Sequence, residues 1–501
     1  MEQEKSKCSL VSFEMADLEY RVIIGLEIHV HLRTATKMFC GCELVYDQQA
    51  NSRVCPVCLG LPGALPVMNK KAFEYAVLAG LALNCEISRF TKWDRKGYYY
   101  PDLPKNYQIT QYDLPFSEHG YIEIPTDDGQ VKKIRITRAH LEEDAGKNTH
   151  TSGNYSRVDL NRAGTPLLEI VTEPDMNSGS EVRVMAVELQ RIVRYLGISD
   201  ADMQKGHMRF EPNVNLIIIK DGKEYRTPIV EIKNLNSFRA LERSVNYEVV
   251  RQLEEFDRTA CVMVKGNKTT RGWDDAGQQT VLQRGKEEAS DYRYFPDPDI
   301  LPVVVTDEWF EEIRGRLCEL PLKKQMRYMA EYNLSEYDAG VLTSERTNAE
   351  FFERVVKAGG EPKRVCNLIT QVGLKIANER GCSLAELGLK EVDIVTLARM
   401  IGNGDISSSA GDKVIHEMIV SRKEPEQIIR ELNLIQKSNA GELVTFVDAV
   451  LAENAKAVAD VRSGGKKSKA AIGFLLGQVI RRTKGQANPE IVSDILNKKL
   501  N

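Results

Sequence analysis

The chain has 501 residues, of which 42% are hydrophobic and 28% charged, and its formal net charge at pH 7 is -4. This composition predicts a folded protein of two to four domains, and it excludes a largely disordered chain or a uniformly basic surface. The first twenty residues form neither a secretion signal nor an Arg-rich transit peptide, and no apolar run reaches about eighteen residues, so we expect a cytoplasmic protein without a membrane span.

Residues 21 to about 302 are dominated by short β-type runs. Segments such as YIEIP and KIRITR alternate apolar and polar residues, which predicts half-buried antiparallel strands. Helical periods at 70–84 and 180–197 interrupt them, and after Asp307 the apolar spacing is almost wholly helical. The predicted fold class is α+β, an antiparallel-sheet domain with helices followed by an all-α helical domain and a small all-α tail domain. The expected boundaries are 1–305, 306–405 and 406–501.

Four of the ten cysteines lie close together near the N-terminus. They occur as C-x-C and then C-x-x-C, at Cys40, Cys42, Cys55 and Cys58. Two close pairs of thiolates suit a tetrahedral zinc ion, and four sulfurs leave no open coordination position, so such a site would be structural. A pair of disulfides is the alternative, but thiols in a cytoplasmic protein stay reduced.

Acidic residues lie within or at the ends of several apolar β-runs. Because side chains alternate along a strand, Glu27 and His29 of GLEIHVHL share one face. Glu142 follows a second strand, and Glu231 lies in the apolar run IVEIKNLN. A buried carboxylate needs a partner, and three such acids converging with one histidine would suit a hard cation such as Mg²⁺. The alternative is that each acid is salt-bridged or faces solvent.

A tyrosine-rich stretch, DRKGYYYPDLPKNYQITQYD, follows the cysteines. It mixes aromatic and cationic side chains, including Arg95, Lys96, Tyr98 and Tyr99. Aromatic rings and cations together can stack a base and neutralise its phosphate, which makes these residues candidates for RNA binding. A β-meander with exposed aromatic edges is the alternative interpretation.

The last 51 residues reverse the sign of the chain's net charge. Residues 451–501 contain ten Lys and Arg and four acids. AAIGFLLGQVI places residues 471, 474, 475 and 479 on one helical face, and basic residues flank this helix. These residues, Lys466, Lys467, Lys469, Arg481 and Arg482, form a candidate phosphate-binding patch. The alternative is a solvated terminal helix.

Several strings together resemble one family. They are GLEIHVHL, KMFCGCE, VCPVCLGLPGALPVMN, DRKGYYYPDLPKNYQITQYD, AHLEEDAGK, VDLNRAGTPLLEIVTEPD, EIKNLNSFRALE, TRGWDD and KEEASDYRYFPDPD. In this order they resemble the B subunit of tRNA-dependent amidotransferases (GatB). The helical remainder is similar to that family's helical and tail domains, so the resemblance covers essentially the whole chain.

The resemblance implies a function. The family's B subunit works in a heterotrimer with an amidase A subunit and a small C subunit, and converts Glu-tRNA(Gln) to Gln-tRNA(Gln) or Asp-tRNA(Asn) to Asn-tRNA(Asn). It is a ligase that forms carbon–nitrogen bonds with glutamine as the amide donor. Its first domain, called the cradle, would hold the charged tRNA end, ATP and Mg²⁺, and its tail would contact the tRNA body.

The resemblance also assigns residue roles. The family's Mg²⁺ ligands and catalytic residues correspond here to Glu27, His29, Glu142 and Glu231. The stretch QKGHMRFEPN (204–213) departs from the family pattern, because Glu211 replaces an aspartate and His207 replaces a serine.

Three other functions fit parts of the sequence. A non-catalytic, zinc-stabilised tRNA-binding scaffold would explain the tyrosines and the basic tail but not the isolated acids. The related E subunit usually carries an inserted domain for which 501 residues leave little room. A ligase acting on a small metabolite would not need the basic tail. ATP consumption that depends on charged tRNA would separate the scaffold from the enzyme.

Overall fold

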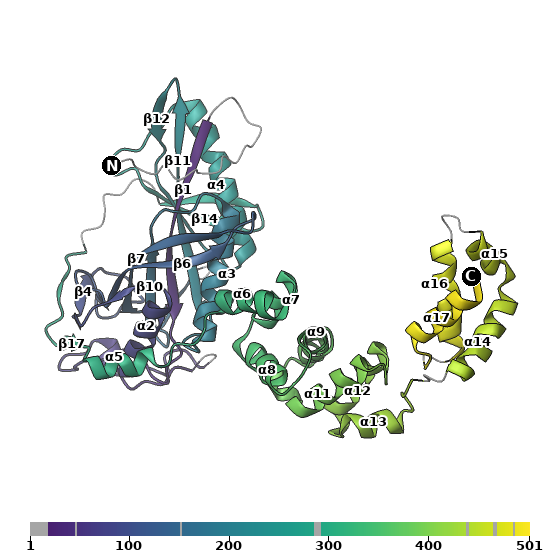
Figure 1. Cartoon of the computed structure of the whole chain (residues 1–501). Helices are drawn as coiled ribbons and strands as arrows, with labels where there is room; N and C mark the ends of the chain where they lie inside the picture. Colours follow the sequence, from purple (N-terminus) through teal and green to yellow (C-terminus); the bar gives the residue numbers. More distant parts are fainter. Residues whose placement is uncertain are drawn as a thin grey trace. The chain divides into compact units, whose positions relative to one another are not determined.

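The computed structural model describes residues 19–45, 48–150, 153–284, 292–436, 440–463, 468–483 and 486–500. It divides into two compact units, Met1–Leu322 and Lys323–Asn501 (Figure 1). The first unit contains the β-structure and the second is helical. Each unit is described by itself.

A large sheet organises the first unit. In the described residues it has ten strands in the order β15-β14-β13-β11-β1-β10-β7-β6-β2, with β12 paired to β11. All of these pairings are antiparallel except β13–β14. The strands are β1 (Glu19–His31), β2 (Glu86–Ile87), β6 (Ser117–Pro125), β7 (Val131–Glu143), β10 (Pro166–Thr172), β11 (Met208–Lys220), β12 (Lys223–Arg226), β13 (Val230–Lys233), β14 (Thr269–Asp274) and β15 (Gln279–Arg284).

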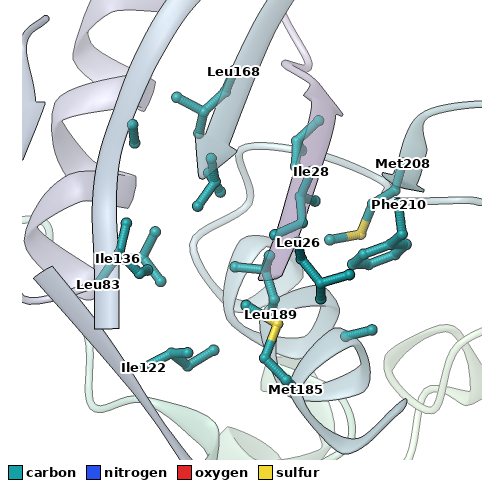
Figure 2. Packing of buried hydrophobic residues seen from close by; sticks show 14 of the residues in the cluster. Leu26, Ile28, Leu83, Ile122, Ile136, Leu168, Met185, Leu189, Met208 and Phe210 are labelled. Atoms are coloured by element: carbon teal, nitrogen blue, oxygen red, sulfur yellow. The ribbon is translucent and has the colours of Figure 1, made fainter. Parts of the chain in front are cut away.

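The two faces of β1 differ in polarity because its sequence alternates. Ile24, Leu26 and Ile28 point to one face and are at most 1% exposed, whereas Glu27 and His29 point to the other. The apolar face packs against helices α2 (Lys70–Ala82), α3 (Gly179–Tyr195) and α4 (Phe238–Thr259). Figure 2 shows Leu26 and Ile28 in one cluster with Met185 and Leu189 of α3.

Side-chain caps fix where the long helices begin. Ser178 precedes α3 and its hydroxyl accepts a hydrogen bond from the backbone N–H of Glu181. Ser237 precedes α4 and accepts one from Ala240 in the same way. Such caps satisfy amides that the first helical turn leaves unpaired.

Three smaller sheets bring distant loops together. Strand β4 (Asp94–Gly97) lies between β5 (Tyr107–Thr110) and β16 (Phe295–Pro296), which joins the tyrosine-rich stretch to the PDPD loop. Strand β3 (Phe90–Thr91) pairs with β17 (Val303–Val304), and β8 (Lys147–His150) pairs with β9 (Ser156–Asp159). Two short helices, α1 (Pro56–Leu59) and α5 (Asp307–Arg314), also belong to this unit.

The second unit is all-helical in its described part and contains two apolar cores. One core runs from Tyr328 to Ile429 and the other from Leu443 to Leu500. None of the described helices of the protein is long and apolar enough to cross a bilayer. The helices are α6 (Pro321–Tyr332), α7 (Glu336–Leu342), α8 (Arg346–Lys357), α9 (Pro362–Asn367), α10 (Leu374–Arg380), α11 (Glu391–Gly402), α12 (Ser408–Ser421), α13 (Pro425–Glu431), α14 (Ala440–Glu453), α15 (Ala455–Arg462), α16 (Ser468–Arg482) and α17 (Pro489–Leu500).

The predicted fold class is confirmed. A mixed α+β region with a large, mostly antiparallel sheet is followed by an all-helical region. The sequence analysis did not identify α4, a helix of 22 residues that covers the sheet. The three domain boundaries stay a prediction.

Candidate functional site

The polar face of the sheet carries rows of charged side chains. The antiparallel register sets His29 of β1 directly beside Glu169 of β10, which in turn pairs with His140 of β7. On its other side His29 pairs with Arg209 of β11, and the next row sets Glu27 beside Glu211. Paired positions in a sheet face the same side, so these groups meet although they are far apart in sequence.

Three carboxylates surround the imidazole of His29. Its Nε2 lies 3.4 Å from a carboxylate oxygen of Glu169, 3.7 Å from Glu27 and 3.8 Å from Glu142. The Nε2 of His140 lies 3.7 Å from Glu169 and 3.8 Å from Glu142. Donor atoms of Glu27, His29 and Glu169, and likewise of His140, Glu142 and Glu169, all lie within 4.8 Å of one another, so each set could hold a metal ion.

The electrostatics of this cluster favour a cation. Burial alone would lower the pKa of His29, but its interactions with Glu169 and Glu142 outweigh that effect and raise the pKa to about 9. Burial and the nearby Glu169 raise the pKa of Glu27. The proton on His29 therefore offsets part of the acidic charge, and a divalent cation bound by the same donors would displace it.

Other cations border the cluster. Arg209 lies 3.1 Å from Asp144, which also lies 2.6 Å from Nε2 of His31. Burial opposes the charge of Lys96, yet Glu142 and Glu169 hold its pKa well above the ordinary value. The ammonium of Lys96 lies 4.9 Å from the ring centre of Tyr292.

Glu231 lies two strands away from β1 and has its own partners. Its carboxylate is 3.1 Å from the ammonium of Lys233 and 3.4 Å from that of Lys268. Burial would raise its pKa, but these two lysines lower it to about 2. Lys233 also pairs with Glu211 at 2.7 Å. The structure thus brings Glu27, His29 and Glu142 together and places Glu231 outside both three-residue sets found in the described residues.

The sequence analysis missed two members of the cluster, His140 and Glu169. Both carry signals that could have identified them. His140 precedes Glu142 by two residues, so the alternation rule that joined Glu27 with His29 applies to it as well. Glu169 lies inside the apolar run PLLEIVT, as Glu231 lies inside its own run.

The four predicted thiols come together. The sulfurs of Cys40, Cys42, Cys55 and Cys58 all lie within 4.8 Å of one another, and those of Cys55 and Cys58 are 3.8 Å apart. A tetrahedron with zinc–sulfur bonds of about 2.3 Å has edges of about 3.8 Å, so the thiols fit this ion.

The surroundings of the four cysteines favour the deprotonated form of one of them, Cys58. The hydrogen bond with Cys40, together with the nearby ammonium of Lys37, lowers the pKa of Cys58 to about 4. Burial and the neighbouring thiols raise the pKa of Cys42 to about 11. A metal that binds all four sulfurs would displace the remaining protons.

The tyrosine-rich stretch has both buried and exposed parts. Arg95 pairs with Asp297 at 2.6 Å and Asp299 at 2.8 Å, so its charge is already neutralised. Tyr98 is half-buried, whereas Tyr99 is 73% exposed and could stack on a base.

The tail helix α16 offers fewer free cations than the sequence suggests. Lys469 and Arg481 are exposed, but Arg482 pairs with Glu453 at 2.7 Å. Lys466 and Lys467 lie outside the described residues. Of the four residues placed on one face of this helix, Ala471, Leu475 and Val479 are buried, whereas the side chain of Phe474 is 48% exposed.

The fold and these sites define an α+β domain whose sheet carries two sets of side chains that could hold a metal ion and whose four clustered cysteines could hold another, followed by a helical region. Residues 22–311 match the family model described as the GatB/GatE catalytic domain, and residues 350–500 match the GatB domain model. The B subunits of aspartyl/glutamyl-tRNA(Asn/Gln) amidotransferase from Carboxydothermus hydrogenoformans and from Thermoanaerobacter sp. strain X514 are each 47% identical over 96% of this chain and over 99% and 100% of their own lengths. The Thermotoga maritima protein of the same name is 46% identical over 96% of this chain and 99% of its own. The chain belongs to the GatB family of amidotransferase B subunits.

The thiol group generates a first prediction. Replacing Cys55 by Ser should lower the zinc content of the purified protein and reduce its thermal stability, because a structural metal contributes to folding. Metal analysis and a thermal melt measure both effects. Cys382→Ser, a change in the second unit outside the thiol group, is the control; zinc-free wild-type protein would contradict the expectation.

The acidic cluster generates a second prediction, on Mn²⁺ as a probe of the cation site. Glu169→Gln should weaken Mn²⁺ binding by at least about tenfold, since the substitution removes a donor shared by both three-residue sets. Glu231→Gln tests a residue on which two arguments disagree. The structure places Glu231 outside both three-residue sets, whereas the family resemblance names it as a metal ligand. Unchanged binding would agree with its lysine pairing, and equal weakening would place Glu231 among the ligands. Electron paramagnetic resonance of free Mn²⁺ measures both variants.

Proposed function

We propose that this B subunit uses ATP and Mg²⁺ to activate the side-chain carboxylate of Glu-tRNA(Gln), Asp-tRNA(Asn) or both for amidation. The observation that carries this proposal is the buried cluster of Glu27, His29, Glu142 and Glu169 in a chain of the GatB family. A non-catalytic scaffold would have no use for three acids held against one imidazole.

The chemistry requires such a site. A carboxylate is a poor acyl donor, and transfer of a phosphoryl group from ATP converts its oxygen into a phosphate leaving group. Magnesium, when bound, would neutralise phosphate oxygens and align them for transfer.

The chain's own residues would prepare the site. Glu27, Glu142 and Glu169 would bind the cation through carboxylate oxygens, and His29 would release its proton to offer a neutral nitrogen. Lys96, held in its charged form beside Glu142, would contact a phosphate oxygen.

The proposal includes partners. The chain contains neither a G-x-S-x-G string nor a recognisable amidase arrangement, so ammonia would come from glutamine through an amidase A subunit. A small C subunit would complete the heterotrimer, and zinc would hold the four-thiol loop. Because charged tRNA is used in translation, the complex would act in the cytoplasm.

The tail would bind the body of the tRNA. Lys469 and Arg481 of α16 are exposed and would meet phosphates, and Tyr99 of the first unit would contact the acceptor end.

The proposed chemistry predicts the behaviour of Glu142→Gln. This variant should abolish amidation of charged tRNA and the ATP consumption that depends on it, because a neutral amide cannot replace an anionic ligand. Glutaminase activity of the reconstituted complex should remain. Loss of both activities together would indicate a collapsed complex, and full amidation would favour the scaffold.

The tail generates a further prediction, tested with substitutions because α14 to α17 share one apolar core that a deletion from residue 451 would expose. The double variant Lys469→Ala, Arg481→Ala should weaken tRNA binding. Each lost phosphate contact should reduce the slope of log affinity against log salt by roughly 0.7–0.9. Filter binding over a salt series measures the slope. Lys499→Ala, at a lysine paired with Asp448, is the matched control. An unchanged slope in the double variant would contradict the patch.

A further inference from the structure

Lys37 lies between the four clustered cysteines and the turn at residues 160–165, and its side chain is 0% exposed. Its ammonium lies 3.8 Å from the sulfur of Cys58 and donates a hydrogen bond to the carbonyl oxygen of Leu160 at 3.2 Å. Its backbone N–H donates to the carbonyl of Cys42 at 3.0 Å. A buried charge costs free energy unless anionic or polar partners compensate it, so the ammonium needs both the sulfur and the carbonyl.

The metal state of the cysteines decides how firmly the ammonium is held. A zinc ion bound by four thiolates leaves the group with a net charge of about -2 and fixes each sulfur at a corner of a tetrahedron. Without the ion, the cysteine side chains are free to change rotamer. The anionic partner of Lys37 then has no fixed place.

The turn at 160–165 packs against the stem of Lys37. Gly164 has a φ of +86°, and a Cβ at this position would lie 3.4 Å from Cδ of Lys37. The backbone N–H of Met38 donates to the carbonyl of Gly164 at 2.7 Å. The lysine and the peptide that follows it therefore contact the turn at Gly164, while the ammonium contacts it at Leu160.

The same turn extends the pairing of β7 with β10. The N–H of Gly164 donates to the carbonyl of Asp144 at 2.8 Å, and the N–H of Asp144 donates to the carbonyl of Thr165 at 2.9 Å. These bonds continue the register that sets Glu169 beside His140. A displacement of the turn would therefore shift the two strands that carry the acidic cluster.

The side chain of Asp144 connects the turn to the remaining strands of the cluster. Its carboxylate lies 2.6 Å from Nε2 of His31 on β1, 3.1 Å from Arg209 on β11 and 3.4 Å from Arg162 of the turn. Arg209 is the cross-strand neighbour of His29. Lys37 is thus joined to the cluster by contacts between buried groups over the whole distance.

We propose that Lys37 is a positioning residue that couples the metal state of the four cysteines to the affinity of the acidic cluster for a divalent cation. A cation site needs its donors held within roughly 0.5 Å of their productive geometry, so a looser turn weakens binding without removing a ligand. The coupling goes beyond the proposed function but rests on its cation site.

The test measures the Kd for Mn²⁺ by electron paramagnetic resonance, with the full-length chain in its heteromeric complex and without nucleotide or tRNA. Lys37→Met removes the ammonium and keeps an unbranched side chain of similar length. With zinc bound, this variant raises the Kd roughly 3- to 10-fold. Lys132→Met is the matched control, at a half-buried lysine of β7 whose ammonium donates to Asn177 and Glu181, and it leaves the Kd unchanged.

Removal of zinc with a chelator tests the same link from the other end. In the wild-type complex it raises the Kd for Mn²⁺ by a similar factor, and one equivalent of zinc reverses the change. In Lys37→Met it has no further effect, because the link is already broken. An unchanged Kd in zinc-loaded Lys37→Met, or an equal effect of zinc removal in variant and wild type, overturns the inference. If Lys37→Met fails to fold, Lys37→Gln, which keeps a donor but no charge, takes its place.

This inference and the proposed function fail in different ways. A wild-type complex that binds no Mn²⁺ would contradict the cation site, and the coupling with it. Wild-type binding that neither the Lys37 variants nor zinc removal alters would contradict the coupling and leave the cation site standing.

Discussion

The structure of the first unit depends on one constraint, the burial of several carboxylates on one face of a sheet. Glu27, Glu142 and Glu169 all approach the imidazole of His29 within 4 Å. Like charges held together in a partly buried place repel each other, and their mutual repulsion falls only when a cation or a proton lies between them. The apolar face of the same strands, packed on α2, α3 and α4, is what keeps the acids in place. The helices therefore stabilise a geometry that the acids alone would not keep.

The surrounding cations show which acids remain available to a ligand. Lys233 and Lys268 neutralise Glu231, and Lys233 also pairs with Glu211. No lysine or arginine in the described residues forms an ion pair with Glu27 or Glu169; each has only imidazole partners. A site built for stability alone would pair each acid with its own cation. His140, His29 and Lys96 lower the pKa of Glu169 against the effect of its burial, whereas burial and Glu169 raise the pKa of Glu27, so an added cation would gain most beside Glu27.

Much of this could be predicted from the sequence, because local patterns determine it. The alternation of apolar and polar residues along GLEIHVHL predicted a strand at β1 with Glu27 and His29 on one face. The spacing of the cysteines predicted that Cys40, Cys42, Cys55 and Cys58 come together. The partners of those residues could not be predicted in the same way. That Glu169 lies beside His29 depends on the register between β1 and β10, which no local pattern contains. Likewise, the lysines that form ion pairs with Glu231 come from its own strand and from the residues before β14. Helix α4 was not predicted, because the region that contains it was interpreted mainly as strands.

The thiol group and the acidic cluster are connected through Lys37, which is fully buried. Its ammonium lies 3.8 Å from the sulfur of Cys58 and 3.2 Å from the carbonyl oxygen of Leu160. The backbone N–H of the next residue, Met38, donates to the carbonyl of Gly164 at 2.7 Å. The segment held in this way leads directly into β10, the strand that carries Glu169. A buried lysine needs anionic or carbonyl partners, and a metal-bound thiolate is a lasting one. The cysteine loop, through these contacts, braces the start of the strand that carries Glu169.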